Sequence, residues 1–314
     1  MKQMTIKPSF SILILLLVSV VTYAQDYEFR VIGSKGSVLL DGKILRVGTK
    51  INLNQVIEIG EGAYLGLAHK SSKTLELTKA GTFKVSDLKA RLSANTGGLA
   101  SKYARFVANE LTSDDSRKTR FAQRVKTGSV SRGLDDIKFM LPAASTYVDP
   151  TSVVTMKWYY DEPVTPEGLV YDVVITKISA DDPKVLFSTK TDKTQIEIDL
   201  SDPIYNGISN INVEVSTIYK GELAKRAYGL RKLRGSKLKL FNEEIKEFTD
   251  KESPLGKVIL ARFYEDKKLF ANAVHQYEKA LEVAQIDQYK TLYDDFLKGN
   301  MMTKSSRKNT SPND

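Results

Sequence analysis

The chain has 314 residues, a formal net charge of +9 and no cysteine. The missing cysteines exclude disulfides, a thiolate nucleophile and a cysteine-ligated metal site, and in an exported protein they favour a bacterial envelope over a eukaryotic extracellular setting. The length is typical of two or three domains, and we expect a multidomain chain that is mainly β with a C-terminal α part.

Residues 1–24 predict a secretory signal peptide. Lys2 and Lys7 precede the apolar run at 10–21, and the small residues Thr22 and Ala24 stand where a signal peptidase reads. A retained membrane anchor is the alternative, but the run is shorter than the roughly 20 apolar residues that a bilayer crossing needs. We therefore expect cleavage after Ala24, a mature charge of +7 without the two lysines, no transmembrane segment after cleavage, and a periplasmic, secreted or cell-surface location.

Residues 25–92 predict a small β-domain of short strands punctuated by glycine. Asp41-Gly42 stands between two apolar runs and predicts a two-residue hairpin turn, because both turn positions take a positive φ. The run 36–85 resembles the FecR-type periplasmic domain, and it departs from that family at Ser71-Ser72, where an Asp-Gly turn is usual. The resemblance is carried by turn residues, namely Gly42, Gly48, Gly62 with Ala63, and Gly81.

The FecR-type resemblance implies a sensing or scaffolding role. Signal-relaying members of that family carry a cytoplasmic anti-sigma segment and a membrane crossing before this domain, and we expect neither in this chain. Direct control of a sigma factor is therefore not expected, and recognition of a ligand or a partner protein is the role that the resemblance leaves.

Residues 93–135 predict a connector with one amphipathic helix. Its apolar stripe, at helical spacing, comprises Leu99, Tyr103, Phe106, Val107 and Leu111. A single stripe usually packs on a neighbouring domain, and a membrane-surface or partner helix is the alternative. The charged stretch 112–120 follows, and the run 128–133 returns to β and resembles the Arg-Gly strand that often follows the FecR-type domain.

Residues 136–235 resemble an immunoglobulin or fibronectin type III-like sandwich, because alternating strands follow one another at intervals of about ten residues. Trp158 lies in phase with Val154 and Met156, which predicts a core position, and an exposed carbohydrate-stacking residue is the alternative. The later alternating sets are Tyr171, Val173 and Ile175; Ile196, Ile198 and Leu200; and Ile211, Val213 and Val215.

Residues 236–300 predict helices. Ser253 and Pro254 supply an N-cap and a first-turn proline, and an apolar stripe at helical spacing precedes them, made of Leu238, Phe241, Ile245 and Phe248. The stretch 260–281 resembles a tetratricopeptide repeat. The six residues at its packing offsets are Leu260, Ala261, Tyr264, Ala273, Tyr277 and Ala280.

One such repeat cannot bury its faces alone, so we expect the helices at 237–248 and 287–298 to act as neighbours or caps. The polar tail 301–314 predicts disorder. Three small cores, two of sheets and one of helices, are expected to lie side by side. The helical end is expected to present a surface to a peptide or a partner protein of the envelope.

The sequence predicts no catalytic residue, no cofactor and no metal site. His69 and His275 have no carboxylate or second histidine at a ligand spacing, so both are expected to be ordinary surface or half-buried residues. Adjacent carboxylates occur at 114–115, 135–136, 181–182, 243–244 and 294–295, and they leave a carboxylate-based glycan hydrolase as an alternative.

The stretch 220–239 holds eight basic residues against the single acid Glu222. We favour a solvated edge strand protected by charge, and the functional alternative is an anion-facing strip in which Arg231, Lys232 and Arg234 contact a partner. The expected function is a non-catalytic binding or scaffold protein of the envelope. Binding of an anionic glycan or peptidoglycan is the alternative, and nucleic acid is not expected for an exported chain.

Overall fold

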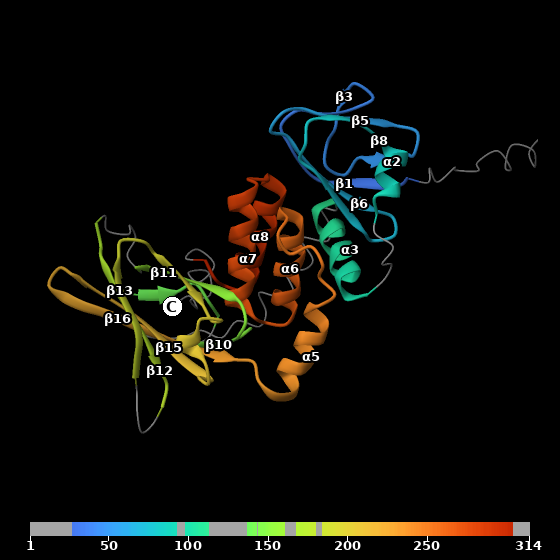
Figure 1. Ribbon diagram of the computed structural model, residues 1–314. Coiled ribbons are helices and arrows are strands. Elements are labelled where there is room, and N and C mark those ends of the chain that lie inside the picture. Colours follow the sequence, from blue (N-terminus) through green and yellow to red (C-terminus); the bar gives the residue numbers. More distant parts are fainter. Residues whose placement is uncertain are drawn as a thin grey trace, which may run out of the picture.

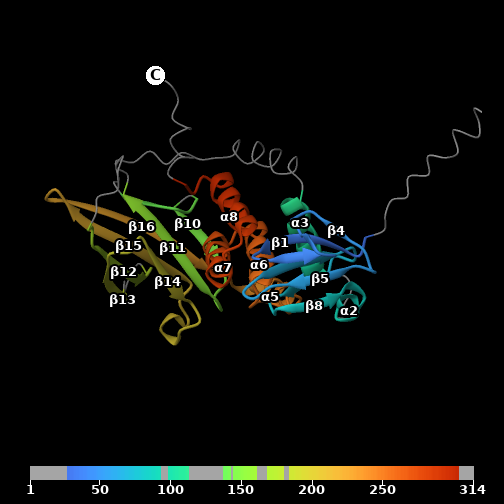
Figure 2. The same ribbon diagram turned by 90° about the horizontal axis from the view of Figure 1, so that it is seen from above.

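The helices of the C-terminal part lie between two β parts, one at each end of the molecule (Figure 1, Figure 2). The computed structural model describes residues 27–92, 98–112, 137–142, 144–160, 168–179 and 184–303. The expected signal peptide, the run 128–133, almost all of the charged stretch 112–120 and most of the tail lie outside these ranges. The chain is mainly β with a C-terminal helical part, as the sequence predicts.

Two four-stranded sheets enclose the core of the first β part. One has the order β4-β1-β6-β7 and the other β3-β2-β5-β8. Their fully buried core includes Phe29, Val31, Ile51, Ile57 and Leu65. The strands are β1 (Phe29–Lys35), β2 (Val38–Leu40), β3 (Lys43–Ile44), β4 (Lys50–Ile51), β5 (Val56–Ile59), β6 (Tyr64–His69), β7 (Thr74–Leu77) and β8 (Gly81–Lys84), and the short helix α2 (Val85–Ala90) follows.

The predicted hairpin turn between β2 and β3 is confirmed. Leu40 pairs with Lys43, and the two residues between them have φ values of 49° for Asp41 and 76° for Gly42. The Asp41 carboxylate also accepts a hydrogen bond from the Val56 backbone N–H at 2.9 Å, which ties the turn to β5. The local signal in the sequence therefore fixes this turn.

Helix α3 (Leu99–Thr112) packs on its neighbours, as its single apolar stripe predicts. Tyr103, Val107 and Leu111 are buried, and the helix contacts β1, β6, α6 and α8. The Tyr103 hydroxyl donates a hydrogen bond to Asp266 at 2.5 Å, which fixes α3 to the end of α6. The alternative of a free membrane-surface helix is wrong for this stripe.

The second β part has a five-stranded sheet, β10-β16-β15-β12-β13, and a three-stranded sheet, β14-β11-β9. Trp158 is 1% exposed and lies edge-on against Phe139 and Tyr171, so its predicted core position is confirmed and the carbohydrate-stacking alternative is wrong. The strands are β9 (Ile137–Phe139), β10 (Ser145–Val148), β11 (Val153–Tyr160), β12 (Tyr171–Lys177), β13 (Lys184–Thr191), β14 (Gln195–Asp199), β15 (Asn210–Tyr219) and β16 (Glu222–Lys232).

Four helices follow the second β part: α5 (Gly235–Ile245), α6 (Pro254–Asp266), α7 (Phe270–Val283) and α8 (Asp287–Gly299). Ser253 caps α6 by accepting a hydrogen bond from the Gly256 N–H at 3.0 Å, as predicted. Helix α5 ends before Phe248, which is nevertheless buried. All six predicted packing positions of the helical hairpin are buried, namely Leu260, Ala261, Tyr264, Ala273, Tyr277 and Ala280.

The expectation of three separate cores is wrong, because the described residues form two hydrophobic clusters. One fills the first β part, and the other runs continuously through the second β part, α3 and the C-terminal helices. Helix α7 packs directly on β10 and β11, and α8 contacts β1. Tyr264 and Tyr277 are buried against neighbouring elements of the chain. The packing face of the α6–α7 hairpin is therefore part of the core and is not free to bind a partner.

Buried polar contacts join the helices to both β parts. The Tyr264 hydroxyl donates a hydrogen bond of 2.9 Å to Asp149, which lies just before β11 in the chain. On the other side, the Glu76 carboxylate of β7 accepts hydrogen bonds from the Ser253 hydroxyl at 2.6 Å and from the Leu255 N–H at 2.9 Å, at the N-terminus of α6. A carboxylate is favoured at a helix N-terminus, where unpaired N–H groups and the helix dipole meet it. These contacts fix the two ends of the molecule to one helical centre.

Candidate functional site

The basic stretch runs from β16 into α5, and the edge-strand explanation is wrong for its C-terminal half. Arg231 has a strand partner on each side, Asn210 of β15 and Tyr147 of β10. In the other half of β16, Lys225 forms an ion pair with Glu214 of the neighbouring strand, at 2.9 Å. Protection of a sheet edge therefore does not account for the charges near Arg231.

Lys232, one of the three candidate partner contacts, lies against the protein. Its ammonium donates hydrogen bonds to the backbone carbonyls of Tyr205 at 2.8 Å and Leu200 at 3.2 Å. Burial lowers the pKa of Lys232, as expected for an ammonium partly removed from water. The prediction that Lys232 contacts a partner is corrected, because this side chain holds the turn that precedes β15.

Four other cations of the stretch are exposed: Arg231, Arg234, Lys237 and Lys239. Arg234 makes one long contact, 3.4 Å to the Ser209 hydroxyl, and the Lys237 ammonium lies 5.1 Å from the centre of the Tyr147 ring. Within the described ranges, none of the four lies in an ion pair. We call these four residues the basic strip, and sequence reasoning identified two of them, Arg231 and Arg234, as candidate contacts.

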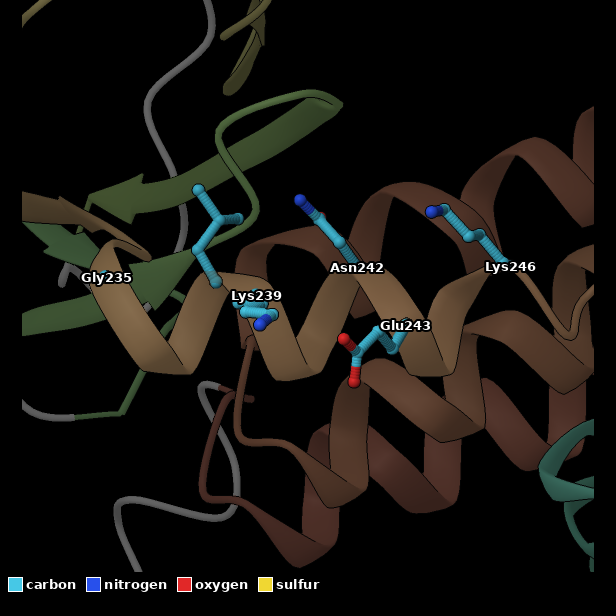
Figure 3. A pocket seen from close by; sticks show the side chains of 6 residues that line it. Gly235, Lys239, Asn242, Glu243 and Lys246 are labelled. Atoms are coloured by element: carbon cyan, nitrogen blue, oxygen red, sulfur yellow. The ribbon is translucent and has the colours of Figure 1, made fainter.

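A shallow groove of about 440 Å³ continues the basic strip along α5 (Figure 3). Asn242 and Lys246 extend toward one side of the helix, while Lys239 and Glu243 project from another (Figure 3). The residues that line it are Gly235, Leu238, Lys239, Asn242, Glu243 and Lys246, whose spacing of three and four positions forms two adjacent rows along the helix. Leu240, 57% exposed, adds an apolar side chain on the same helix.

The face of α5 opposite the groove packs on α6, which leaves the groove side open to solvent. Phe241 stacks on Phe263 and Tyr264 of α6, with ring centres 5.5 and 5.9 Å apart. Glu244 pairs with Lys267 at the end of α6. Helix α5 is thus held by the two ring contacts of Phe241, by Leu238 and Ile245 packed against the core, and by the ion pair of Glu244.

His69 has a carboxylate partner that its sequence neighbours did not reveal. Its Nε2 lies 3.0 Å from Glu28, while its Nδ1 accepts a hydrogen bond from the Ser71 N–H at 3.1 Å and lies 2.7 Å from the Ser71 hydroxyl. His69 is half-buried, as expected, and the fold adds a carboxylate from a distant part of the chain that no spacing in the sequence indicated. Because Ser71 approaches the same nitrogen with both its backbone and its hydroxyl, the arrangement locks the β6–β7 turn.

Burial alone would raise the pKa of the Glu28 carboxyl, but hydrogen bonds from His69, Lys70 and Lys89 outweigh it and lower the pKa from 4.5 to about 2. Glu28 is nearly buried and lies 3.1 Å from Lys70 and 3.2 Å from Lys89. The cluster joins β1, the β6–β7 turn and α2. It serves the stability of the first β part.

His275 is buried rather than half-exposed, and its Nδ1 lies 3.0 Å from the Thr155 hydroxyl of β11. Burial lowers its pKa, which favours the neutral ring. Of the adjacent carboxylates, the pairs at 114–115, 135–136 and 181–182 lie outside the described residues. Glu244 and Asp294 are engaged by Lys267 and Lys290, whereas Glu243 lies in the α5 groove.

No family model and no curated protein matches this chain. Within the described ranges, none of the helices combines the length and the apolar character that a bilayer crossing needs.

Proposed function

We propose that this chain is an exported bacterial envelope protein that binds an acidic partner protein through α5 and the basic strip. The observation that carries the proposal is that Arg231, Arg234, Lys237 and Lys239 are all exposed, with no ion pair within the described ranges, where β16 leads into α5 and its open groove. Unpaired charges of one sign attract an oppositely charged partner and raise its association rate.

The groove adds a second type of contact. Leu238 lines it, so a partner could bury aliphatic surface there while its carboxylates meet the cations. An acidic amphipathic segment supplies both, in the manner of a helix laid into a groove. This surface replaces the α6–α7 hairpin as the partner-facing part of the helical region.

The FecR-like, immunoglobulin-like and tetratricopeptide-like resemblances belong to the same proposal. Support for the first comes from the two glycine-turned sheets, and for the second from two facing sheets around Trp158. Support for the third comes from the burial of all six repeat positions. In this reading the chain is a scaffold whose helical centre holds two β modules apart.

An anionic glycan or peptidoglycan is the second candidate partner. Tyr147, which is partly exposed beside Arg231, is the observation in its favour, because a flat aromatic ring can stack on a sugar. However, the Lys237 ammonium lies over this ring at 5.1 Å and covers one of its faces. We therefore place the acidic protein first.

Cross-linking in intact cells, followed by mass spectrometry, tests the proposal. The variant Arg231→Gln, Arg234→Gln, Lys237→Gln removes three charges from the basic strip. The matched control Lys43→Gln, Lys79→Gln, Lys84→Gln removes three exposed charges from the first β part.

We expect the wild-type protein and the lysine control to cross-link to the same envelope protein. The variant with three neutralised charges in the basic strip should not cross-link to it. The interaction of the purified pair should weaken as salt shortens the Debye length from about 10 Å at 0.1 M. Equal recovery by both variants would refute the role of the basic strip. The second candidate would be favoured if no protein is cross-linked and the chain instead binds peptidoglycan in a salt-sensitive way. Only the variant with three neutralised charges in the basic strip should then lose that binding.

A further inference from the structure

The hairpin that joins β15 and β16 ends in an unusually apolar tip. Its two-residue turn is Lys220-Gly221, with φ values of 52° and 83°, closed by the pair Tyr219 and Glu222. In both views the hairpin reaches the end of the molecule farthest from β1 and β6 (Figure 1, Figure 2). Nothing else in the described chain extends beyond it in these views.

Three aliphatic side chains form a row across neighbouring strands at this tip. Ile218 and Leu223 are direct cross-strand partners and are 70% and 67% exposed. Val170, 51% exposed, lies beside them, since its carbonyl accepts a hydrogen bond from the Thr217 hydroxyl at 2.7 Å. We call Val170, Ile218 and Leu223 the apolar row.

The row lies on the outer face of the sheet. Successive side chains of a strand point to opposite faces. Thr217 and Ala224 are buried on the inner face, so their neighbours Ile218 and Leu223 point outward. Alternation should put polar residues at outer positions, and the next outer pair along the hairpin, Ser216 and Lys225, follows that rule.

The turn residue next to the row, Lys220, fits the boundary between water and lipid. Tyr219 packs on Tyr160 with ring centres 5.3 Å apart, and the Lys220 ammonium lies 4.8 Å from the centre of the Tyr219 ring. Lysine combines an apolar stem with a charged end, which suits a membrane interface. The acid at the tip, Glu222, alternates to the inner side with Tyr219.

We propose that the apolar row inserts into the surface of an anionic lipid membrane. The three side chains offer only roughly 200 Å² of exposed apolar surface, on the basis of about 100 Å² for one aliphatic side chain. A specific protein interface or dimer buries about 800 Å² on each partner. A convex tip of this size lacks the area for a protein partner, whereas a bilayer accepts it and its charge attracts Lys220 and the net-positive chain.

This inference is independent of the proposed partner site. Strand β16 has 11 residues and runs from the tip toward α5, a separation of about 36 Å at roughly 3.3 Å per residue. The tip can therefore touch a bilayer at a distance from the basic strip, although Arg231 lies on the same outer sheet face as Leu223. Variants at the two places can be read separately.

Fluorescence of a single introduced tryptophan tests the insertion. The variant Leu223→Trp places the probe in the apolar row, and Ile44→Trp places it at a comparably exposed position, 77%, on β3 of the first β part. The spectrum of buried Trp158 is subtracted from both. Tryptophan fluorescence reports only on the surroundings of the introduced side chain. Membrane binding through the apolar run at 10–21 would therefore not produce the same signal.

With vesicles of phosphatidylglycerol and phosphatidylethanolamine, we expect Leu223→Trp to shift to shorter wavelength and to be quenched by bromine in the acyl chains. Ile44→Trp should show neither change, and vesicles of phosphatidylcholine alone should weaken the response of Leu223→Trp several-fold. The double variant Ile218→Ser, Leu223→Ser should partition at least tenfold more weakly than wild type. The variant with three neutralised charges in the basic strip keeps the apolar row and should lose much less than this double variant.

Three results would overturn the inference. One is an unchanged Leu223→Trp spectrum on anionic vesicles, and another is equal partitioning of wild type and the double serine variant. The third is a concentration-dependent dimer, seen by light scattering, that the serine variant loses, which would assign the row to a second copy. Circular dichroism of each variant checks that it folds.

Discussion

Tyr289 of α8 enters a socket made by two facing glycines of the first β part. Gly33 of β1 and Gly66 of β6 are register partners, and a Cβ at either position would lie 3.0 and 2.9 Å, respectively, from the Tyr289 hydroxyl oxygen. That hydroxyl is 2.8 Å from the Tyr64 hydroxyl, and the Tyr289 side chain is fully buried. The variant Gly66→Ala therefore adds a methyl group where no space exists.

The expected cost follows from two opposing effects. Overpacking a dense core costs about 1–3 kcal/mol. Replacing glycine in a strand returns roughly 0.5–1 kcal/mol of backbone entropy. We expect Gly66→Ala to lower the free energy of unfolding by about 1–2 kcal/mol. Tyr289→Phe alone removes the hydrogen bond to Tyr64 and should cost about 1 kcal/mol.

The double variant separates the clash from general damage. With Tyr289→Phe, the oxygen nearest to the new methyl group is gone, so the two costs should not add. We expect a coupling energy of about 1 kcal/mol or more in a double-mutant cycle measured by urea unfolding. Additive costs, or a Gly66→Ala variant as stable as wild type, would show that Tyr289 does not fix α8 to the first β part.

Three further predictions concern stability. Gly42→Ala should cost about 1–2 kcal/mol in urea unfolding because its φ is 76° and no atom lies near the new Cβ, and Gly42→Asn should cost less; an equal cost would refute the turn argument. Because the pKa of Glu28 is lowered to about 2 in the folded state, its contribution, roughly 1–3 kcal/mol after solvent screening of the exposed lysines, is present above the unfolded pKa of 4.5 and is lost as pH falls toward 2. Glu28→Gln should flatten the fall of stability across that pH window, and an unchanged slope would contradict it. Tyr264→Phe should cost about 1.5–3 kcal/mol through the lost bond to Asp149, and a loss below about 0.5 kcal/mol would contradict it.

Local patterns in the sequence predicted local structure well. Asp41-Gly42 specified its turn, Ser253 its cap, and the alternation at Tyr171, Val173 and Ile175 its buried strand face. Each of these depends on residues within a few positions of one another, so periodicity and turn chemistry contain the information.

Long-range arrangement was beyond the sequence. Glu28 meets His69 across 41 positions, and Lys232 turns inward to carbonyls that only the fold brings near it. The same limit applies to the candidate site, because the sequence showed a run of basic residues but not which of them are exposed. It also missed the groove on α5, since an open helix face depends on which neighbours cover the other side.

The central claim is that α5 faces a partner, and a photo-activated cross-linker at a single position tests it most directly. The cross-linking residue replaces Leu240 on α5 in one strain and Ile44 on β3, which is at least as exposed, in the other. After irradiation of intact cells, we expect one discrete adduct with an acidic envelope protein from position 240, lost when Arg231, Arg234 and Lys237 are neutralised, and none from position 44. No adduct at position 240, or the same adduct at both positions, would contradict the claim.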